Sequence, residues 1–327
     1  MRVVVRAPAR LHFGFIDLDG SLGRRFGSIG LAIDEPKVIV EATPAHRLSV
    51  TGDESGRAQA LARRFLRHYR LRESVHIALQ QMIPAHVGLG SGTQLALSIA
   101  TALARLFSIE AGVRELASVM GRGKRSGIGV AAFDRGGFIL DGGQQVATTD
   151  HPRNPDSPPH VIIRHPFPED WTFVVAIPNV GRGLAGDAEG RAFRRLSTRH
   201  TGGTGRLSRT ILMQMLPALV ERDPSAFGQS LTTIQRIVGR WFRPVQVGTF
   251  ASPLGARIAG AMVRGGALGV GQSSWGPTVY GMATSEKVAD TMEHEVRKTS
   301  SGRVEATILR ARANNRGAEI RTSQEQR

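Results

Sequence analysis

The sequence contains no cysteine among its 327 residues. This absence excludes disulfide bonds, cysteine nucleophiles and thiolate metal sites. No uninterrupted apolar run reaches the roughly 18 residues that a membrane-spanning helix needs. The N-terminal residues 1–6 are too few and too strand-like for a signal peptide. We therefore expect a cytoplasmic protein without membrane contact, and the chain is long enough for two domains.

Lysine and aromatic residues are also scarce. Only Lys37, Lys124, Lys287 and Lys298 are lysines, so arginine supplies nearly all of the net charge of +16. The arginines are scattered and aromatic residues make up 6% of the chain, which offers no stacking platform for bases. We interpret most of the charge as a bias toward arginine on solvated faces and expect no nucleic-acid partner. A site for acidic small substrates is the alternative, because arginine binds phosphate and carboxylate bidentately.

The apolar patterns divide the chain into a half with strands and inserted helices and a more helical half. Strands are predicted at 31–34 and 38–42 with a turn at Pro36, and the polar tail from residue 314 is expected to fray. These patterns predict an α+β protein with domains at 1–178 and 179–327.

The most informative segment is a glycine-rich loop at residues 83–94, I-P-A-H-V-G-L-G-S-G-T-Q, which runs into an apolar helix. Glycine lets the backbone approach an anion, and the first turn of a helix offers unpaired N–H groups. Ser91 is the expected N-cap. The loop is not a Walker A sequence, because no Gly-Lys-Ser/Thr follows. The predicted phosphate contacts are Gly88, Leu89, Gly90, Ser91, Gly92 and Thr93.

Two further glycine segments carry candidate site residues. Lys124 and Arg125 lie within G-R-G-K-R-S-G-I-G at 121–129, where close backbone approach favours contact with phosphate or carboxylate. The segment G-V-G-Q-S-S-W-G-P at 269–277 supplies hydroxyl donors for phosphate. Its tryptophan either walls an aromatic substrate or packs in the core. The candidates in this second segment are Gln272, Ser273, Ser274 and Trp275.

The N-terminal strand adds a third group. Arg10 and His12 share one face of it, and Asp17 and Asp19 follow before Gly20. In a functional site, Arg10 is an anion clamp, His12 a proton or hydrogen-bond partner, and an aspartate a Mg²⁺ ligand. The alternatives are a half-buried histidine and turn chemistry. Arg24, Arg25 and Ser28 add substrate-binding candidates to the same region.

The glycine loop resembles the phosphate loop of the GHMP superfamily, P-x-x-x-G-L-G-S-S-x-A. The chain keeps Pro84 and the G-L-G-S core but has Gly92 at the second serine and Gln94 at the alanine. The resemblance implies a two-domain fold: an N-terminal domain like a ribosomal-protein module with a left-handed β-α-β crossover, and a ferredoxin-like C-terminal domain. It also implies a homodimer.

One departure from the kinases concerns the catalytic base. Where many GHMP kinases carry an aspartate in S-G-x-D, this chain has Gly129. Phosphoryl transfer that relies on a carboxylate base would be lost. An ATP-dependent small-molecule kinase is therefore the second hypothesis, and a non-catalytic or nucleic-acid-binding protein on the same fold is the third.

Taken together, R-L-H-F-G-F-I-D-L-D-G, G-L-G-S-G-T-Q, R-S-G-I-G-V-A-A-F-D-R-G-G-F-I-L-D-G-G and G-Q-S-S-W-G-P-T resemble the beta-ribofuranosylaminobenzene 5'-phosphate synthase family. The resemblance spans residues 2–310. It implies a decarboxylative ribosyltransferase that joins phosphoribosyl pyrophosphate to 4-aminobenzoate or 4-hydroxybenzoate, with Mg²⁺, in tetrahydromethanopterin biosynthesis. In that reaction the catalytic candidates are Arg10, His12, Lys124 and Arg125, and the candidates for holding metal or orienting arginines are Asp17, Asp19 and Asp141.

Overall fold

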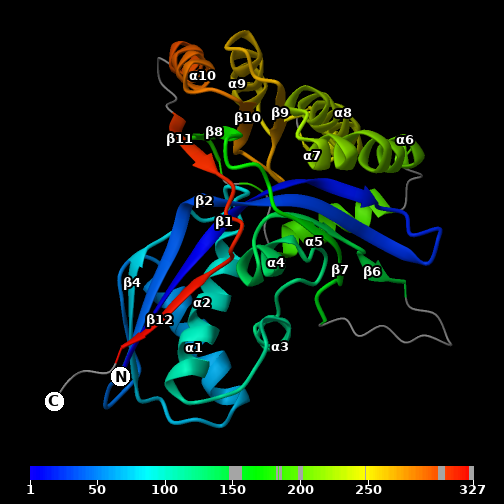
Figure 1. Ribbon diagram of the computed structural model, residues 1–327. Helices are drawn as coiled ribbons and strands as arrows, with labels where there is room; N and C mark the ends of the chain where they lie inside the picture. Colours follow the sequence, from blue (N-terminus) through cyan, green and yellow to red (C-terminus); the bar gives the residue numbers. More distant parts are fainter. Residues whose placement is uncertain are drawn as a thin grey trace.

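The computed structural model describes residues 1–146, 157–181, 183, 186–197, 202–246, 248–300 and 306–323. Two β-sheets, each covered by helices, form two units stacked end to end (Figure 1). Within the described residues, no helix is both long and apolar enough to cross a membrane.

Two long antiparallel strands, β1 (Arg2–Asp17) and β2 (Arg24–Pro44), form the centre of the first sheet. Their inward side chains alternate with outward ones, as the period of a strand requires. The predicted turn at Pro36 is wrong, because β2 continues through it. The register with β1 shifts beside this proline, and a bulge tolerates its missing N–H. The other strands of this sheet are β3 (Ser49–Thr51), β4 (Val75–Gln81), β5 (Phe138–Asp141), β6 (Gln144–Gln145), β7 (Val161–His165) and β12 (Glu319–Ser323).

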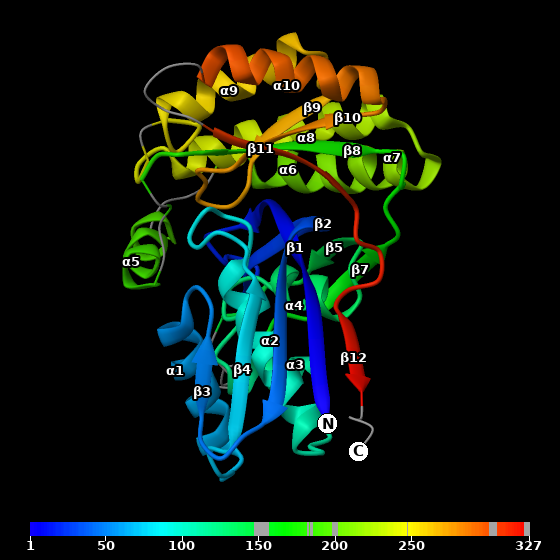
Figure 2. The ribbon, with the colours of Figure 1, turned by 90° about the vertical axis from the view of Figure 1, so that its left-hand side faces the viewer.

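The helices of the first unit pack on one face of this sheet (Figure 2). The apolar helix α2 (Ser91–Leu106) is buried along most of its length and contacts β1 and β2. The parallel pair of β3 and β4 is connected by α1, which gives a β-α-β unit. The remaining helices in this unit are α1 (Ser55–His68), α3 (Val113–Val119) and α4 (Ile128–Asp134).

The second sheet is antiparallel, with the order β11-β8-β10-β9. Numbered along the chain, this order is fourth, first, third, second, so the predicted ferredoxin-like domain is confirmed. Helices α9 and α10 pack together beside this sheet, while α8 contacts both β9 and β1 and so joins the two units (Figure 2). The elements are β8 (Thr172–Pro178), α5 (Gly186–Ser197), α6 (Thr204–Thr210), the π-helix η1 (Ile211–Met215), α7 (Leu216–Glu221), α8 (Pro224–Phe242), α9 (Pro253–Arg264), β9 (Gly269–Gln272), β10 (Val279–Ala283), α10 (Glu286–Ser300) and β11 (Ala306–Arg312).

The predicted domain boundaries need two corrections. Strand β8 belongs to the second sheet, so the first unit ends between His165 and Thr172 rather than at residue 178. The polar tail does not fray as far as Ser323, because β12 pairs with β1 and closes the edge of the first sheet. Backbone pairing, which polar side chains do not prevent, decides the structure of this segment.

We expect that truncation after Ala318 destabilises the first unit. It would remove the five residue pairs between β12 and β1, and each net hydrogen bond contributes about 0.5–1.5 kcal/mol. The urea midpoint should fall by an amount equivalent to about 2–5 kcal/mol. A chain that ends at Ser323 keeps the strand and serves as the control. Equal midpoints for the two chains would contradict a stabilising role for β12.

Candidate functional site

Two glycine segments from different units meet at Gly88. This residue has φ +88°, and a Cβ there would collide with the carbonyl oxygen of Ser273. The Ser273 hydroxyl donates to the Gly88 carbonyl at 2.6 Å and accepts from the His12 backbone N–H at 3.0 Å. These two hydrogen bonds connect the loops. Because Ser273 is fully buried, the geometry does not support its predicted contact with phosphate.

Gln272 and Leu89 also support the loops from behind. The Gln272 side chain accepts from the Ala251 N–H at 2.6 Å and donates to the Ser274 carbonyl at 3.1 Å. Leu89 is buried in the core, so its side chain cannot touch a phosphate. Ser274 lies in the left-handed region at φ 55°, a conformation that for a serine requires support from its surroundings. Unlike Ser273, it lines the cavity described next.

A cavity of about 220 Å³ opens where the two segments meet. It lies at the start of α2, whose first turn supplies N–H groups for an anion. The N-cap is Gly90 at φ 85°, not Ser91 as predicted, and no side chain caps the helix. The lining residues are Arg10, Arg57, His86, Gly88, Gly90, Ser91, Gly92, Thr93, Arg122, Gly186, Glu189, Ser274, Trp275 and Gly276.

Arg10 lines the cavity and also supports the glycine loop, while its role as an anion clamp stays a prediction. Its guanidinium donates to the Gly88 carbonyl and packs against Gly90. Burial lowers the pKa of Arg10 to about 10, and Glu189 acts in the opposite direction. The side chain therefore stays cationic near neutral pH.

Arg57 and Arg122 were missed by the sequence analysis, although both line the cavity. A Cβ at Gly92 would lie 2.5 Å from the Arg57 Nη2 and 3.4 Å from the Arg122 Nη1. A side chain at residue 92 would displace the flexible end of Arg57, so glycine leaves room for the two guanidinium groups beside the loop. Arg122 lies within the glycine segment 121–129 that supplied the candidates Lys124 and Arg125, whereas no local sequence pattern marks Arg57.

The arginines in front of the loop repel one another. Burial, followed by the charges of Arg57 and Arg64, lowers the pKa of Arg122 to about 10. The Arg122 Nε has no hydrogen-bond partner among the described residues, while Arg57 pairs with Glu54 at 3.4 Å. A polyanion in the cavity would offset this repulsion and supply the missing acceptor.

Glu189 joins Arg125 and Trp275 at the far wall of the cavity. Its carboxylate lies 3.1 Å from the Arg125 guanidinium and accepts from the Trp275 indole N–H at 3.2 Å. Trp275 also stacks on Phe242, with ring centroids 4.2 Å apart. Trp275 therefore packs in the core and also lines the cavity, while its contact with an aromatic substrate stays a prediction. Lys124, the other predicted cation in this segment, is exposed.

Behind the site, a buried polar network contains His12 and Asp141. His12 Nε2 lies 3.2 Å from the Ser126 hydroxyl, which lies 2.7 Å from the Ser28 hydroxyl. The Ser28 hydroxyl donates in turn to Asp141. Burial and then Arg10 hold the pKa of His12 well below its usual value, so the imidazole is neutral. The predicted substrate residue Ser28 lies behind Ser126, which sequence reasoning missed.

Asp141 is saturated with donors. Its oxygens also accept from the backbone N–H groups of Gly127 at 2.8 Å, Gly143 at 2.9 Å and Ser28 at 3.2 Å. Burial raises the pKa of Asp141, and these hydrogen bonds oppose the shift. The side chain is therefore committed to the protein interior.

The three aspartates do not build a metal site together. Asp17 accepts from the N–H groups of Asp19 and Gly20, and Asp19 accepts from that of Ser21, which is the turn chemistry considered from the sequence. Within the described part of the chain, no three histidine, aspartate or glutamate side chains are placed to hold a metal. Glu189 is a carboxylate that does line the phosphate cavity.

Arg24 and Arg25 line a different cavity, of about 290 Å³, together with Asp17. Arg24 donates to the carbonyl groups of Gly142 and Gly143 at 2.7 and 2.9 Å, and Arg25 lies over the Phe26 ring. The structure therefore does not bring these two predicted substrate contacts to the glycine loop.

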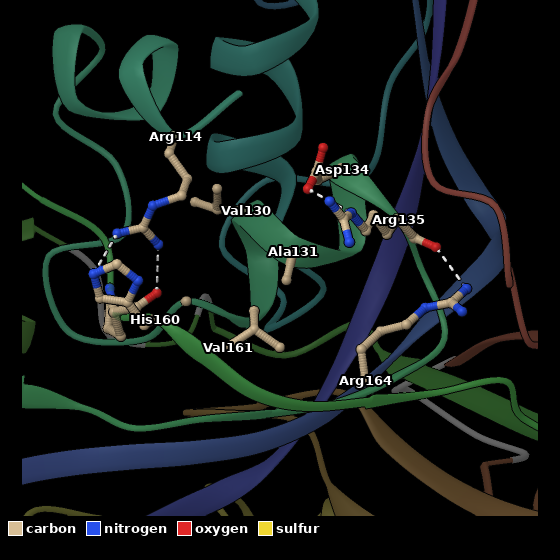
Figure 3. A pocket seen from close by; sticks show the side chains of 10 residues that line it. Arg114, Val130, Ala131, Asp134, Arg135, His160, Val161 and Arg164 are labelled. Carbon is tan, nitrogen blue, oxygen red and sulfur yellow. Dashed lines mark hydrogen bonds and ion pairs between the residues drawn. The ribbon is translucent and has the colours of Figure 1, made fainter. Parts of the chain in front are cut away.

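Another cavity, of about 240 Å³, lies beside α4, with Val130, Ala131 and Val161 on its wall (Figure 3). Two of its arginines are tied to the backbone, and the third, Arg135, pairs with Asp134 at 3.5 Å. Arg114 donates to the carbonyl groups of Pro158 and Pro159, and Arg164 to that of Arg135. The cavity at the glycine loop is the better candidate, since there the Arg122 Nε has no hydrogen-bond partner in the described part of the chain.

Comparison with known proteins agrees with this geometry. The GHMP kinases N terminal domain model matches residues 57–137, and the GHMP kinases C terminal model matches residues 215–301. A beta-ribofuranosylphenol 5'-phosphate synthase of Methanothermobacter thermautotrophicus is 37% identical, covering 97% of this chain and 98% of the relative. A protein of the same name from Archaeoglobus fulgidus is 34% identical, with the same coverage of both chains.

Solved structures share the fold at lower identity. Homoserine kinase of Cytophaga hutchinsonii superposes with a TM-score of 0.66 at 18% identity, covering 98% of this chain and 97% of that one. Mevalonate kinase of Methanococcus jannaschii also gives 0.66, at 14% identity over 95% and 98%. The chain therefore belongs to the GHMP kinase superfamily and, within it, to the family of beta-ribofuranosylphenol 5'-phosphate synthases.

We expect that Arg122→Gln weakens binding of inorganic pyrophosphate about tenfold or more, because a hydrogen bond to a charged group contributes about 1.5–3 kcal/mol. Arg57→Gln should act in the same direction. Isothermal titration calorimetry measures both. Arg67→Gln, an exposed change on the same helix as Arg57, is the control. Unchanged affinity in both cavity variants would exclude these arginines from the anion site.

Proposed function

We propose that this protein transfers the ribosyl 5-phosphate group of phosphoribosyl pyrophosphate to 4-hydroxybenzoate, with release of CO₂ and pyrophosphate. The name shared by relatives at 34–37% identity over nearly the whole chain carries this proposal. A ribofuranosylphenol product retains a ring hydroxyl, which favours 4-hydroxybenzoate over 4-aminobenzoate as the acceptor. The product would lead toward tetrahydromethanopterin.

The cationic cavity supports this reaction through its effect on the leaving group. When the bond between the anomeric carbon and the diphosphate oxygen breaks, its electron pair stays on the diphosphate. Preorganised cations and N–H groups stabilise that developing charge. Three arginines beside the glycine loop can supply this stabilisation: Arg10, Arg57 and Arg122. No carboxylate base is needed for this departure, which fits the presence of Gly129.

The acceptor attacks through the ring carbon that bears its carboxylate. A bond then forms between this carbon and the anomeric carbon of the ribose. The bond to the carboxylate breaks next, its electron pair restores the aromatic ring, and CO₂ leaves. Trp275 lines the cavity. Arg125 is connected to Trp275 because both side chains contact Glu189. Both are candidates for positioning the ring and the carboxylate.

An ATP-dependent kinase is the competing function on this fold. The structures that it resembles include homoserine and mevalonate kinases. Gly129 removes the usual base, and the two arginines at Gly92 add positive charge where the kinase loop carries a serine. The triphosphate of ATP would also suit this concentration of charge, so Gly129 is the observation that argues against the kinase.

We also propose Mg²⁺ as the metal cofactor. Mg²⁺ in such sites is commonly held by one or two carboxylates together with substrate phosphates. Glu189 lines the cavity, and binding a metal there would require it to give up Arg125 or Trp275 as a partner. Asp17, Asp19 and Asp141 have partners outside this cavity. When bound, the metal would neutralise diphosphate charge. We also propose that the protein is a cytoplasmic homodimer with no nucleic-acid or membrane partner. The exposed side chains of Leu212 and Met213 offer apolar surface for the second subunit.

Incubation with phosphoribosyl pyrophosphate, Mg²⁺ and carboxyl-labelled 4-hydroxybenzoate should release labelled CO₂. Parallel reactions contain labelled 4-aminobenzoate, or ATP in place of the ribose donor. We expect release only with the ribose donor, and faster release from the hydroxy acid, because the product retains the ring substituent. Absence of label from both acids would overturn the proposed reaction. ATP consumption with an alcohol acceptor would establish the kinase instead.

Removal of Mg²⁺ with excess EDTA should abolish turnover, and added Mg²⁺ should restore it. Glu189→Gln should raise the Mg²⁺ concentration that gives half-maximal rate, because one anionic ligand is lost. Glu169→Gln, an exposed change remote from the cavity, is the control. Full activity in EDTA would show that arginines and N–H groups suffice for the leaving group.

A further inference from the structure

His86 lies in the turn that leads into the glycine loop, and its backbone is in the left-handed region at φ 60°. Three other non-glycine residues with positive φ lie at helix ends, where this conformation is ordinary: Arg70 follows α1, Ser108 follows α2 and Arg222 ends α7. His86 ends no helix, and glycine is the usual residue at such a turn position. The histidine therefore retains a steric cost that glycine would remove.

The second unit fixes the backbone of His86 from two sides. The Gly183 N–H donates to the His86 carbonyl at 2.8 Å. The Thr278 N–H donates to the Val87 carbonyl at 3.3 Å. A Cβ at Gly183 would lie 2.3 Å from the Gly276 carbonyl oxygen and 3.1 Å from that of His86. Three backbone segments therefore converge at His86 and hold its left-handed conformation in place.

The side chain of His86 is available to a ligand. His86 is half-buried and lines the cavity at the glycine loop. Its imidazole makes no hydrogen bond or ion pair with another residue in the described part of the chain. An imidazole has at least one N–H in either protonation state. His86 is therefore a hydrogen-bond donor at the cavity whose acceptor the described residues do not supply.

His86 lies away from the arginines of the cavity. Arg57 and Arg122 lie beside Gly92, at the end of the loop that starts α2. The backbone of His86 instead meets the segment that carries Trp275. The cavity therefore has a cationic end and an end lined by His86 and Trp275. The cationic end suits the diphosphate of the donor, which leaves the other end for the acceptor.

We propose that His86 binds the carboxylate of the aromatic acceptor through one imidazole N–H, while the acceptor ring lies against Trp275. This inference rests on the proposed function. Arg125 is not among the residues that line the cavity, and it pairs with Glu189 at 3.1 Å. That pair also compensates the charge of Glu189, which would otherwise repel the acceptor. His86 is thus the acceptor-binding donor at this end of the cavity.

A single imidazole N–H suits a carboxylate that must leave as CO₂. An interaction that stabilises the bound acid as strongly as the transition state does not speed the chemical step. A bidentate arginine would grip the carboxylate strongly, whereas one N–H orients it with less stabilisation. Strong cations therefore lie where negative charge develops, at the diphosphate, and a weaker donor lies where negative charge is lost.

His86→Gly separates binding from folding, because glycine adopts the left-handed conformation without steric cost. Loss of one hydrogen bond to a charged group should raise the KM for 4-hydroxybenzoate about tenfold or more, while the KM for phosphoribosyl pyrophosphate changes less than about twofold. The urea midpoint should stay equal or rise. Ser108→Gly removes the same kind of strain beyond the other end of α2 and is the matched control. It should change neither KM.

Two inhibitors that compete with the acceptor test the contact itself. Benzoate has the carboxylate and lacks the hydroxyl, whereas phenol has the hydroxyl and lacks the carboxylate. In His86→Gly, inhibition by benzoate should weaken about tenfold and inhibition by phenol should not change. Weaker inhibition by phenol, with benzoate unaffected, would place His86 at the ring hydroxyl and overturn the proposed contact.

The remaining outcomes also decide the proposal. Weaker binding of pyrophosphate to His86→Gly in calorimetry would assign His86 to the ribose donor and overturn the inference. A lower urea midpoint with an unchanged KM for 4-hydroxybenzoate would show that His86 has only a structural role. Both results would leave the proposed function intact. If wild-type protein releases no CO₂ from the acid, the proposed function itself fails, and this inference fails with it.

Discussion

The site depends on the contact between Gly88 and Ser273. One hydroxyl bonds both to the carbonyl of the phosphate loop and to the backbone of β1 at His12. Through it, a loop of the second unit is fixed against two elements of the first. The cavity lies between these elements. Its shape depends on the close approach of Gly88 to the Ser273 backbone, which a Cβ at residue 88 would prevent. The two units therefore form one site and not two adjoining ones.

The same close packing explains why the loop departs from the kinase pattern. Arg10 supports the loop from behind through the Gly88 carbonyl, and Arg57 and Arg122 approach it from the front at Gly92. A serine at residue 92 would displace the flexible end of Arg57. Replacement of one hydroxyl donor by two cations suits a site that stabilises a departing diphosphate. The glycine and the arginines are thus parts of one adaptation.

Local sequence patterns were sufficient for the glycine loop, for Arg10 and for Ser274, because short-range backbone requirements mark them. They also predicted the ferredoxin-like order of the second sheet through the family resemblance. Arg57 and Glu189 could not be predicted in this way, because only long-range packing brings them to the site. Strand β12 was missed for the same reason, since its partner β1 lies at the other end of the chain.

The high net charge has two physical meanings, which burial and partners distinguish. Arg310 on β11 pairs with Glu293, Asp290 and Glu286, so its charge is neutralised locally. The hydrogen bonds with Glu293 and then Asp290 raise its pKa. Arg122 has arginine neighbours instead, and its pKa is lowered. The total of +16 therefore says little about function, whereas the guanidinium groups of Arg57 and Arg122 beside Gly92 make this cavity suited to an anion. The charge that matters is the charge that the folded chain leaves uncompensated at the cavity.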